Sequence, residues 1–224
     1  MLAEFILVGS AALTMCLGHR WGQSIDLVLA EPGQRLPRVQ INAWQDDLQA
    51  RGMAMDFTQD PEAVQTFRKS GMDLADYRQA FMVAGGVKVA LGCSDPPLDR
   101  LVGGKRSDPV RIANLDELLA AAAYACSERS KTRDCFALYV LLTRYGYTLR
   151  RVYEVFQRAE HMNAFNIAQM RLRRCAAVPG DECYASLLEN SPSVQDMRLF
   201  FNQELDLLAR DRLAGANSLA PRHL

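Results

Sequence analysis

The sequence predicts an α+β fold in which a mixed β-sheet with flanking helices precedes a C-terminal helical bundle. The first observation is an apolar run, 5–8, which ends at a Gly-Ser pair and leads into a short helical pattern and a second strand. The second is a pair of strand-like runs, 77–83 and 87–93, joined by the turn Ala84-Gly85-Gly86. The third is the chain after Asn114, where apolar residues recur at helical spacing.

Length and composition fit this organisation. The chain has 224 residues, of which 49% are hydrophobic and 23% charged, as in ordinary globular proteins. That length allows one large domain or two small ones. The change from mixed to helical patterns divides the chain into an α/β domain over 1–112 and a helical domain over 113–224.

The elements of the first half follow from turn and cap residues. Glu31-Pro32-Gly33 separates the second strand from the first long helix, and Gly52 ends that helix. Pro61 occupies the first position of a short helix after Asp60. The apolar face of the long helix is expected to consist of Val39, Ile41, Trp44 and Leu48. We expect strands over 4–8, 25–29, 53–57, 77–83, 87–93 and 110–113, and helices over 11–18, 37–51 and from Pro61.

The second half has clear helix boundaries. Asn114 and Glu117 have the spacing of an N-cap and capping box. Gly146 ends one helix and Thr148 caps the next, while Pro179-Gly180 and Pro192 separate later ones. Further helices are predicted over 132–145, 148–160, 163–175, 181–189 and 193–212.

The apolar N-terminus is not predicted to be a signal peptide or membrane anchor. The stretch 2–18 has no Lys or Arg before it, contains Glu4 and is too short to cross a bilayer. We therefore expect a cytoplasmic protein with no membrane association. The six cysteines lack the CxxC and His/Cys spacings of zinc sites, which favours reduced core thiols.

The first thirty residues indicate a phosphate site. Backbone N–H groups at Gly9 and Ser10, before a helix, are placed to receive phosphate. Asp26 on the following strand is a candidate Mg²⁺ ligand. The alternatives are a tight strand-to-helix turn and a solvated acid at a strand end.

A basic block follows the first domain. Residues 129–175 contain ten Lys and Arg against three Asp and Glu, a net charge of +7, although the whole chain is neutral. Such a block attracts a phosphate backbone, or it is a solvated helical surface. The loose helix-turn-helix spacing around Gly146 adds a DNA-reading module as a further alternative. The candidate nucleic-acid contacts are Arg144, Arg150, Arg151, Arg158, Arg171, Arg173 and Arg174.

Three blocks of the chain resemble the AbiEii nucleotidyltransferase-like toxins. The first is 5–13, with Gly18-His19-Arg20 and Ser24-Ile25-Asp26 after it. The second is 111–119 with Arg129, Asp134 and Tyr139, and the third is 146–149 with 197–201. The blocks occur in family order and cover most of the chain. The resemblance implies a nucleotidyltransferase fold, with Mg²⁺ and a nucleoside triphosphate as cofactor and substrate.

The departures from the family concern its metal site. The family has a second metal carboxylate two residues after Asp26, where this chain has Val28, and a third at the position of Ala90. Ala122 and Ala137 also replace a Lys and an Asp of the family pattern. Valine and alanine supply no oxygen ligand to a hard cation. Asp26 is therefore a remnant catalytic residue and at most a weak ligand for one hydrated Mg²⁺, with Asp95 and Asp99 as nearby acids that could replace the missing ones.

The resemblance leads to three functional hypotheses. In the first, the chain is a degenerate, inactive or weakly active relative that binds a nucleotide, an RNA or a protein partner. In the second, it is an active Mg²⁺-dependent nucleotidyltransferase toxin that modifies tRNA or protein. In the third, it is a helical interaction or DNA-binding protein. An antitoxin-like protein partner is implied by the family. The residues expected to contact a nucleotide are Gly9, Ser10, Arg129, Lys131 and Asp134.

Overall fold

The computed structural model describes residues 4–17, 24–31, 33–93, 111–178 and 190–218. The chain divides into unit 1, Met1–Ala121, and unit 2, Ala122–Leu224. The predicted loop over 94–108 and the predicted helix over 181–189 lie outside the described residues.

Unit 1 contains a six-stranded mixed sheet with the strand order β3-β4-β5-β2-β1-β6. β1 is antiparallel to β2 and parallel to β6, β2 is parallel to β5, and β3, β4 and β5 are successively antiparallel. All four residues of β1 are buried, as expected of a continuous apolar run in a central strand. The mixed sheet confirms this part of the predicted fold. The strands are β1 (Phe5–Val8), β2 (Ser24–Leu29), β3 (Met55–Thr58), β4 (Arg78–Val83), β5 (Val87–Gly92) and β6 (Arg111–Ile112).

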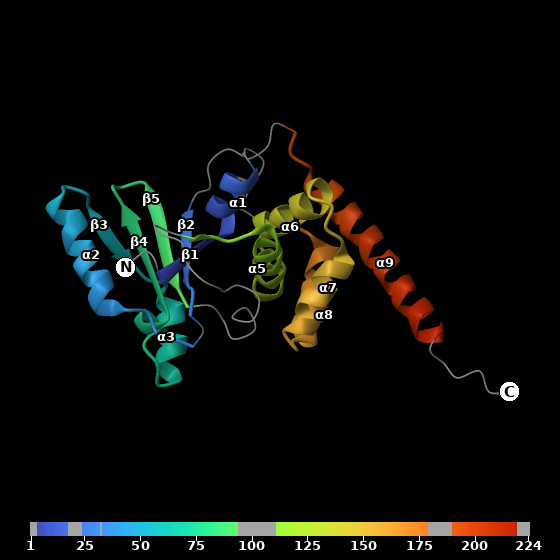
Figure 1. Ribbon diagram of the computed structural model, residues 1–224, viewed down its shortest axis with the longest axis horizontal. Helices are drawn as coiled ribbons and strands as arrows, with labels where there is room; N and C mark the ends of the chain where they lie inside the picture. The colour runs from blue at the N-terminus through green and yellow to red at the C-terminus, as the bar shows by residue number, and fades with distance from the viewer. Residues whose placement is uncertain (1–3, 18–23, 32, 94–110, 179–189, 219–224) are drawn as a thin grey trace. The chain divides into compact units, whose positions relative to one another are not determined.

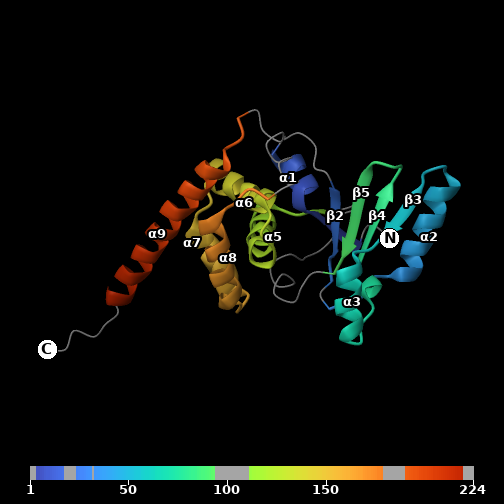
Figure 2. The same cartoon turned by 180° about the vertical axis from the view of Figure 1, so that it is seen from behind.

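Helices of unit 1 pack on this sheet, and α2 lies beside β3 in both ribbon views (Figure 1 and Figure 2). They are α1 (Gly9–Leu17), α2 (Arg38–Ala50), the short 3₁₀ helix η2 (Leu74–Asp76) and the start of α5 (Leu115–Glu128), while α3 (Pro61–Lys69) contacts η2. From α2, Ile41 belongs to the same buried core cluster as Phe81 and Leu91, and Trp44 is partly buried against this cluster. The prediction for Val39 is wrong, since this side chain is 80% exposed. Ile41 is two positions after Val39, a rotation of about 200° around a helix, which puts the two side chains on opposite faces.

The start of α5 has the predicted capping box. Asn114 Oδ1 accepts from the Glu117 N–H at 3.0 Å, and Glu117 Oε2 accepts from the Asn114 N–H at 2.8 Å. Arg111 on β6 also donates to both carboxylate oxygens of Glu117, at 2.7 and 2.8 Å. The box thus ties the sheet edge to the helix.

Unit 2 is a helical bundle, as predicted. After the end of α5 it contains α6 (Thr132–Arg144), α7 (Leu149–Arg158), α8 (Met162–Arg174) and α9 (Val194–Ser218). Gly146 adopts a φ of +69° between α6 and α7, and Thr148 caps α7 by accepting from the Arg151 N–H at 3.3 Å. Phe156 lies at the centre of the core, with ring centroids 4.6 Å from Tyr124 and 5.7 Å from Phe165.

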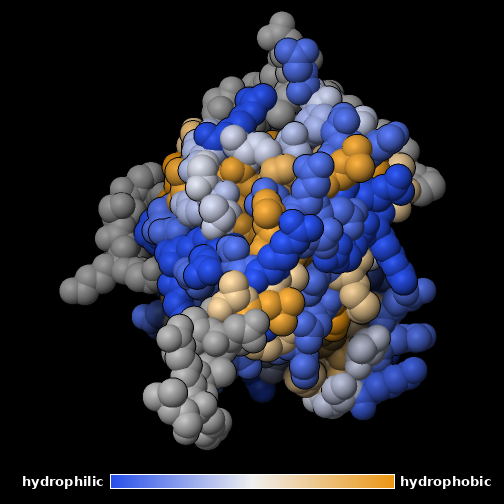
Figure 3. Space-filling view, turned by 90° about the vertical axis from the view of Figure 1, so that its right-hand side faces the viewer, coloured by the Kyte–Doolittle hydropathy of each residue, from blue (hydrophilic) through white to orange (hydrophobic). Residues whose placement is uncertain are grey.

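The surface is mainly hydrophilic on the side shown in Figure 3, with small apolar patches between charged and polar residues. On α9, Leu199, Leu207 and Leu213 are exposed. Single exposed apolar residues are ordinary on globular proteins. Within the described part of the chain, no helix is both long and apolar enough to cross a bilayer.

Three of the cysteines lie together in unit 2. Cys126, Cys135 and Cys175 are buried and free, as predicted for reduced core thiols. A hydrogen bond with Cys126 and burial raise the pKa of the Cys135 thiol, and a hydrogen bond with Cys135 does the same for Cys175. Cys16 differs from the prediction because it is exposed. Cys183 lies outside the described residues.

Candidate functional site

The strand-to-helix turn predicted to receive phosphate begins with Gly9. β1 ends at Val8, and Gly9 has a φ of +67°, a conformation that L side chains rarely adopt. α1 then starts at Gly9 itself, two residues before the predicted start, and Thr14 Oγ1 donates to Ser10 O at 2.8 Å. The N–H groups of Gly9 and Ser10 therefore lie in the first turn of α1, where a helix has no internal acceptors for them.

Asp26 lies against this turn. The antiparallel register pairs Asp26 with Val8, so the carboxylate reaches the residue that follows β1. A Cβ added to Gly9 would lie only 2.7 Å from Asp26 Oδ2 and 3.4 Å from the Asp26 Cβ. Ser24 Oγ donates to the same Oδ2 at 2.9 Å. Glycine is thus required at position 9 both by its backbone conformation and by the proximity of Asp26.

The three positions of the family's carboxylates share one face of the sheet. The β2–β5 register places Asp26 opposite Ala90 and Val28 opposite Gly92. Paired residues of neighbouring strands have side chains on the same face, as do residues two apart in one strand. Asp26, Val28 and Ala90 therefore lie on a common face, where they contribute one carboxylate and two apolar side chains.

This donor set does not fit a pair of Mg²⁺ ions. A two-metal site needs several oxygen ligands within reach of ions about 4 Å apart. Here Asp26 supplies one carboxylate and Ser24 a hydroxyl that already bonds it. Among the described residues, no group of three or more His, Cys, Asp and Glu is arranged to hold a metal. Asp95 and Asp99 lie outside the described residues. The carboxylate of Asp26 suffices for one largely hydrated cation.

The other predicted nucleotide contacts belong to unit 2. Asp134 is buried in the first turn of α6 and binds Arg129 in a bidentate pair, with Nε to Oδ2 at 2.7 Å and Nη2 to Oδ1 at 3.0 Å. Asp134 is also favoured there by the helix N-terminus. Lys131 precedes α6, and its side chain makes no capping hydrogen bond. The Arg129–Asp134 pair stabilises the start of α6, so these two residues have a structural role in the free protein.

Two of the predicted nucleic-acid contacts are also engaged within unit 2. The guanidinium of Arg171 donates to the carbonyl oxygens of Cys126, at 3.4 Å, and Ser127, near the end of α5. Arg173 donates to Asn202 Oδ1 at 3.0 Å and to Asp206 Oδ1 at 2.7 Å, which joins α8 to α9. These bonds hold the helices of the bundle together.

The remaining five arginines are at the surface. Arg144, Arg150, Arg158 and Arg174 are exposed, and Arg151 is half-buried beside Glu154 at 3.4 Å. Arg150 lies 3.9 Å from Asp211, with both side chains more than 60% exposed. Exposed pairs of this kind contribute about 0–1 kcal/mol and are readily exchanged for another anion. The surface arginines of α6, α7 and α8 are therefore available for phosphate contacts.

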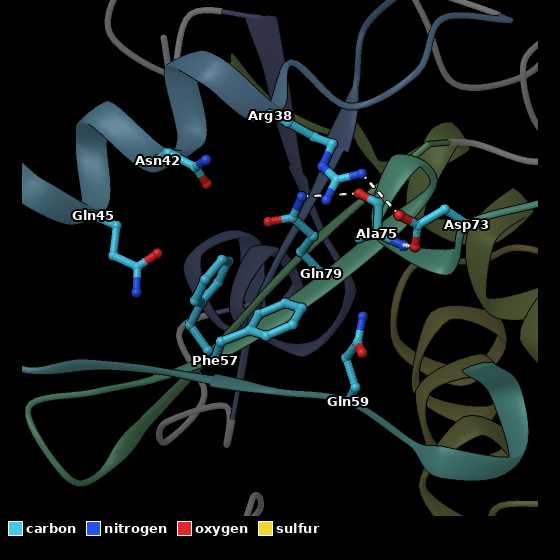
Figure 4. Close-up of a pocket in the computed structure, with 9 residues that line it drawn as sticks. Arg38, Asn42, Gln45, Phe57, Gln59, Asp73, Ala75 and Gln79 are labelled. Carbon is cyan, nitrogen blue, oxygen red and sulfur yellow. Dashed lines mark hydrogen bonds and ion pairs between the residues drawn. The ribbon is translucent and has the colours of Figure 1, made fainter.

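Two cavities of unit 1 lie away from the predicted phosphate site. The larger, of about 360 Å³, is formed by α2, η2 and strands β3 and β4 (Figure 4). The smaller, of about 290 Å³, lies beside Glu4, Glu31 and Gln34. Sequence reasoning did not identify the larger one. Its signal was the polar spacing Arg38, Asn42 and Gln45 on α2, at intervals of four and three residues, which a solvated helix face also produces.

Comparisons with known proteins give one structural likeness. No protein-family model and no curated protein matches the chain. The crystal structure of a candidate nucleotidyltransferase from H. pylori is similar at 14% identity, with a TM-score of 0.49, over 93% of this chain and 88% of that one. Likeness at this level assigns no activity to the chain.

Proposed function

We propose that the chain is a nucleotidyltransferase-like protein that binds a nucleotide with Mg²⁺ at the Gly9–Asp26 turn and lacks efficient transferase activity. The observation that supports this most directly is that Asp26, Val28 and Ala90 are neighbours on one face of the sheet and contribute a single carboxylate among them. The strand–glycine–helix arrangement supports phosphate binding because a helix has no internal acceptors for the N–H groups of its first turn. Among the described residues, no group of three or more His, Cys, Asp and Glu could hold a metal.

The position of Asp26 makes nucleotide binding depend on a cation. The N-terminus of α1 carries a partial positive charge of about half an elementary unit. A phosphate approaching Gly9 also meets the carboxylate of Asp26, whose Oδ2 lies beside this residue. Asp26 would hold Mg²⁺, and the charge of the cation would offset this repulsion. We therefore expect Mg²⁺-nucleotide to bind better than the free nucleotide.

The cost of the missing ligands explains the expected inactivity. Metal ions stabilise the charge that develops in phosphoryl and nucleotidyl transfer by several kcal/mol, and each 1.36 kcal/mol changes the rate tenfold. One weakly held ion would leave most of this stabilisation absent. The transfer rate would then fall by several orders of magnitude, whereas ground-state binding needs only a modest interaction energy.

Calorimetry tests the binding part of this proposal. ATP and CTP are titrated into the full chain, with Mg²⁺ and with a chelator. We expect Asp26→Asn to weaken binding of the Mg²⁺ forms and to strengthen binding of the free nucleotides, each about tenfold, because it removes one negative charge. Asp56→Asn is the matched control, since Asp56 is an exposed residue of β3 with the same charge. Equal responses of the two variants would contradict a role for Asp26.

A transfer assay tests the catalytic part. Labelled nucleoside triphosphates are incubated with tRNA or with the protein alone, and no label is expected on either above background. Sustained transfer that is lost in Asp26→Asn would instead support the active nucleotidyltransferase hypothesis, with ligands supplied from outside the described residues.

The exposed arginines of unit 2 support a second candidate function, binding of RNA through its phosphates. Removal of one arginine–phosphate interaction should reduce the slope of log affinity against log salt by about 0.7–0.9. Arg150→Ala and Arg174→Ala should therefore weaken tRNA binding and lower the slope. Arg68→Ala, an exposed residue of α3 in unit 1, is the control. Affinity that is independent of salt in all variants would contradict this function. The antitoxin-like partner implied by the resemblance has no support from a described residue.

A further inference from the structure

The larger cavity of unit 1 has the size and lining of a small-molecule site. Its volume, about 360 Å³, lies at the low end of the range for ligand pockets, roughly 300–1,000 Å³. It lies between α2 and the outer strands β3 and β4, and η2 closes one end (Figure 4). A single ring system with its substituents suits this volume better than an oligomer.

The cavity lies on the opposite face of the sheet from Asp26. Register places Asp26, Ala90 and Ala80 in one row across β2, β5 and β4. Gln79 and Phe81, which line the cavity, flank Ala80 in the strand and so point to the other face. The inference that follows is therefore independent of the proposed nucleotide site.

Four carboxamide side chains converge on the cavity. Asn42 and Gln45 come from α2, Gln79 from β4, and Gln59 from the residue that follows β3. Figure 4 shows them directed toward a common space from three sides. Carboxamides carry both donors and acceptors, and they pair in a directional way with the edges of planar heterocycles.

Two of these amides are held with their oxygens free. Gln79 Nε2 donates to Ala75 O at 2.9 Å, and Gln45 Nε2 donates to Met55 O at 3.0 Å. Gln79 is only 5% exposed, so its amide has little freedom to turn over. Each amide nitrogen uses one N–H in these bonds, and the two carbonyl oxygens have no hydrogen bond from another described residue. The cavity therefore offers fixed acceptors and calls for a ligand with N–H donors.

The charges in the lining cancel one another. Arg38 Nη1 donates to Asp73 Oδ2 at 2.8 Å and to Asp76 Oδ1 at 3.1 Å, and these bonds raise the pKa of Arg38. Arg35 is bound to Asp76 as well, at 3.2 Å. Arg38 and Asp73 are the two charged residues among the described residues that line the cavity. Because no charge in the lining is left to compensate an ion, a neutral ligand loses less solvation free energy on entering the cavity than an ion would.

Phe57 supplies an apolar wall. Its ring packs against Phe81 with centroids 5.4 Å apart, and 46% of the residue stays exposed. β3 is an edge strand of the sheet, so this exposed side borders solvent. An exposed aromatic ring next to amides is a common arrangement for stacking a base.

We propose that this cavity binds a nucleobase bearing an exocyclic amino group, such as adenine or cytosine. The amino group donates to the free oxygens of Gln45 and Gln79, the ring lies against Phe57, and Asn42 and Gln59 adapt to the remaining edge. A base with a carbonyl in place of the amino group sets an acceptor against an acceptor. A site built for hydrogen bonding discriminates strongly against such an analogue.

The test measures the side-chain NH₂ resonances of Asn42 and Gln59 in the ¹⁵N-labelled full chain by NMR. Adenosine is compared with inosine, and cytidine with uridine, because in each pair the amino group is replaced with a carbonyl and the neighbouring ring nitrogen gains a proton. We expect saturable shifts with adenosine or cytidine, and affinity about tenfold lower for the analogue of the one that binds. Absence of saturable shifts with all four nucleosides, or equal affinity within both pairs, overturns the proposal. Equal displacement by glucose or putrescine also overturns it.

Substitutions of lining residues test whether the base binds in this cavity. Phe57→Leu retains an apolar contact with Phe81 but removes the stacking face, and Asn42→Ala removes an exposed amide. Both should weaken binding, while Gln49→Ala, an exposed glutamine at the end of α2, should not. Unchanged affinity in Phe57→Leu and Asn42→Ala contradicts the site.

A titration with single-stranded oligoadenylate shows whether the bound base comes from an RNA strand or from a free nucleoside. Tighter binding than that of adenosine identifies a base within an RNA strand, and equal or weaker binding identifies a free nucleoside. Either result is consistent with base recognition.

Discussion

Replacing Gly9 by alanine should lower the free energy of unfolding of unit 1, because the β1–α1 turn is closely packed against Asp26. Alanine at a φ of +67° costs about 1–2 kcal/mol in any background. The new Cβ would also lie 2.7 Å from Asp26 Oδ2, so the carboxylate must move away and lose its hydrogen bond from Ser24. A hydrogen bond to a charged group is worth about 1.5–3 kcal/mol. Gly9→Ala should thus destabilise unit 1 by about 2.5–5 kcal/mol, against about 1–2 kcal/mol when Asp26 is already alanine.

Urea unfolding followed by tryptophan fluorescence measures this difference. Both tryptophans, Trp21 and Trp44, belong to unit 1, so the signal reports on the unit that carries the substitution. The four proteins of the double-mutant cycle should give a coupling of about 1.5 kcal/mol or more, since neighbouring groups are not additive. A coupling below about 0.5 kcal/mol, the usual limit for independent sites, would refute the proposed contact between position 9 and Asp26.

Three further predictions concern stability. Glu117→Ala should cost about 3–5 kcal/mol in the same urea experiment, because Arg111 and Glu117 form a bidentate pair with side chains only 17% and 7% exposed; a cost below about 1 kcal/mol would contradict this. Arg171→Met should lower the thermal midpoint of unit 2 measured by circular dichroism, because it removes the hydrogen bonds of Arg171 to α5. Arg174→Met should leave this midpoint nearly unchanged, since its effect on the free energy of unfolding should be less than about 0.5 kcal/mol. Equal shifts of the midpoint in the two variants would argue against the bonds of Arg171 to α5. Hydrogen bonds from the Ala75 N–H and then from Arg38 lower the pKa of Asp73 in the folded protein, so the contribution of Asp73 to stability is present above the ordinary pKa of 3.8 and is lost as the pH falls through the lower folded value. Asp73→Asn should therefore flatten the dependence of stability on pH below about pH 4, whereas Asp56→Asn should not.

Features encoded by neighbouring residues were predictable from the sequence. The Asn114–Glu117 capping box and the Thr148 cap need only residues three apart, and both form as expected. The run 5–8 forms a buried central strand because four apolar residues in succession suit a strand covered on both faces. Val39 was misplaced because it was grouped with Ile41, Trp44 and Leu48 as one apolar face, although its angular position around the helix differs from that of Ile41 and its side chain is exposed.

Features that depend on distant partners were not predictable. Arg171 and Arg173 belong to a basic run in sequence, but their acceptors lie in α5 and α9, separated from them by 29 to 45 residues. The larger cavity of unit 1 is likewise formed by residues of α2, β3 and β4, which are far apart in the sequence. The resemblance in motifs suggested that Asp26 and Ala90 lie opposite each other. Only the register between β2 and β5 establishes this pairing.

The central claim is that Asp26 is the one carboxylate among the three neighbouring positions 26, 28 and 90. Electron paramagnetic resonance of Mn²⁺, a stand-in for Mg²⁺ with the same preference for oxygen ligands, counts the ions held by the full chain. We predict at most one weakly bound ion, which Asp26→Asn releases and Asp56→Asn does not. Two tightly bound ions per chain, spin-coupled to each other, would contradict the claim.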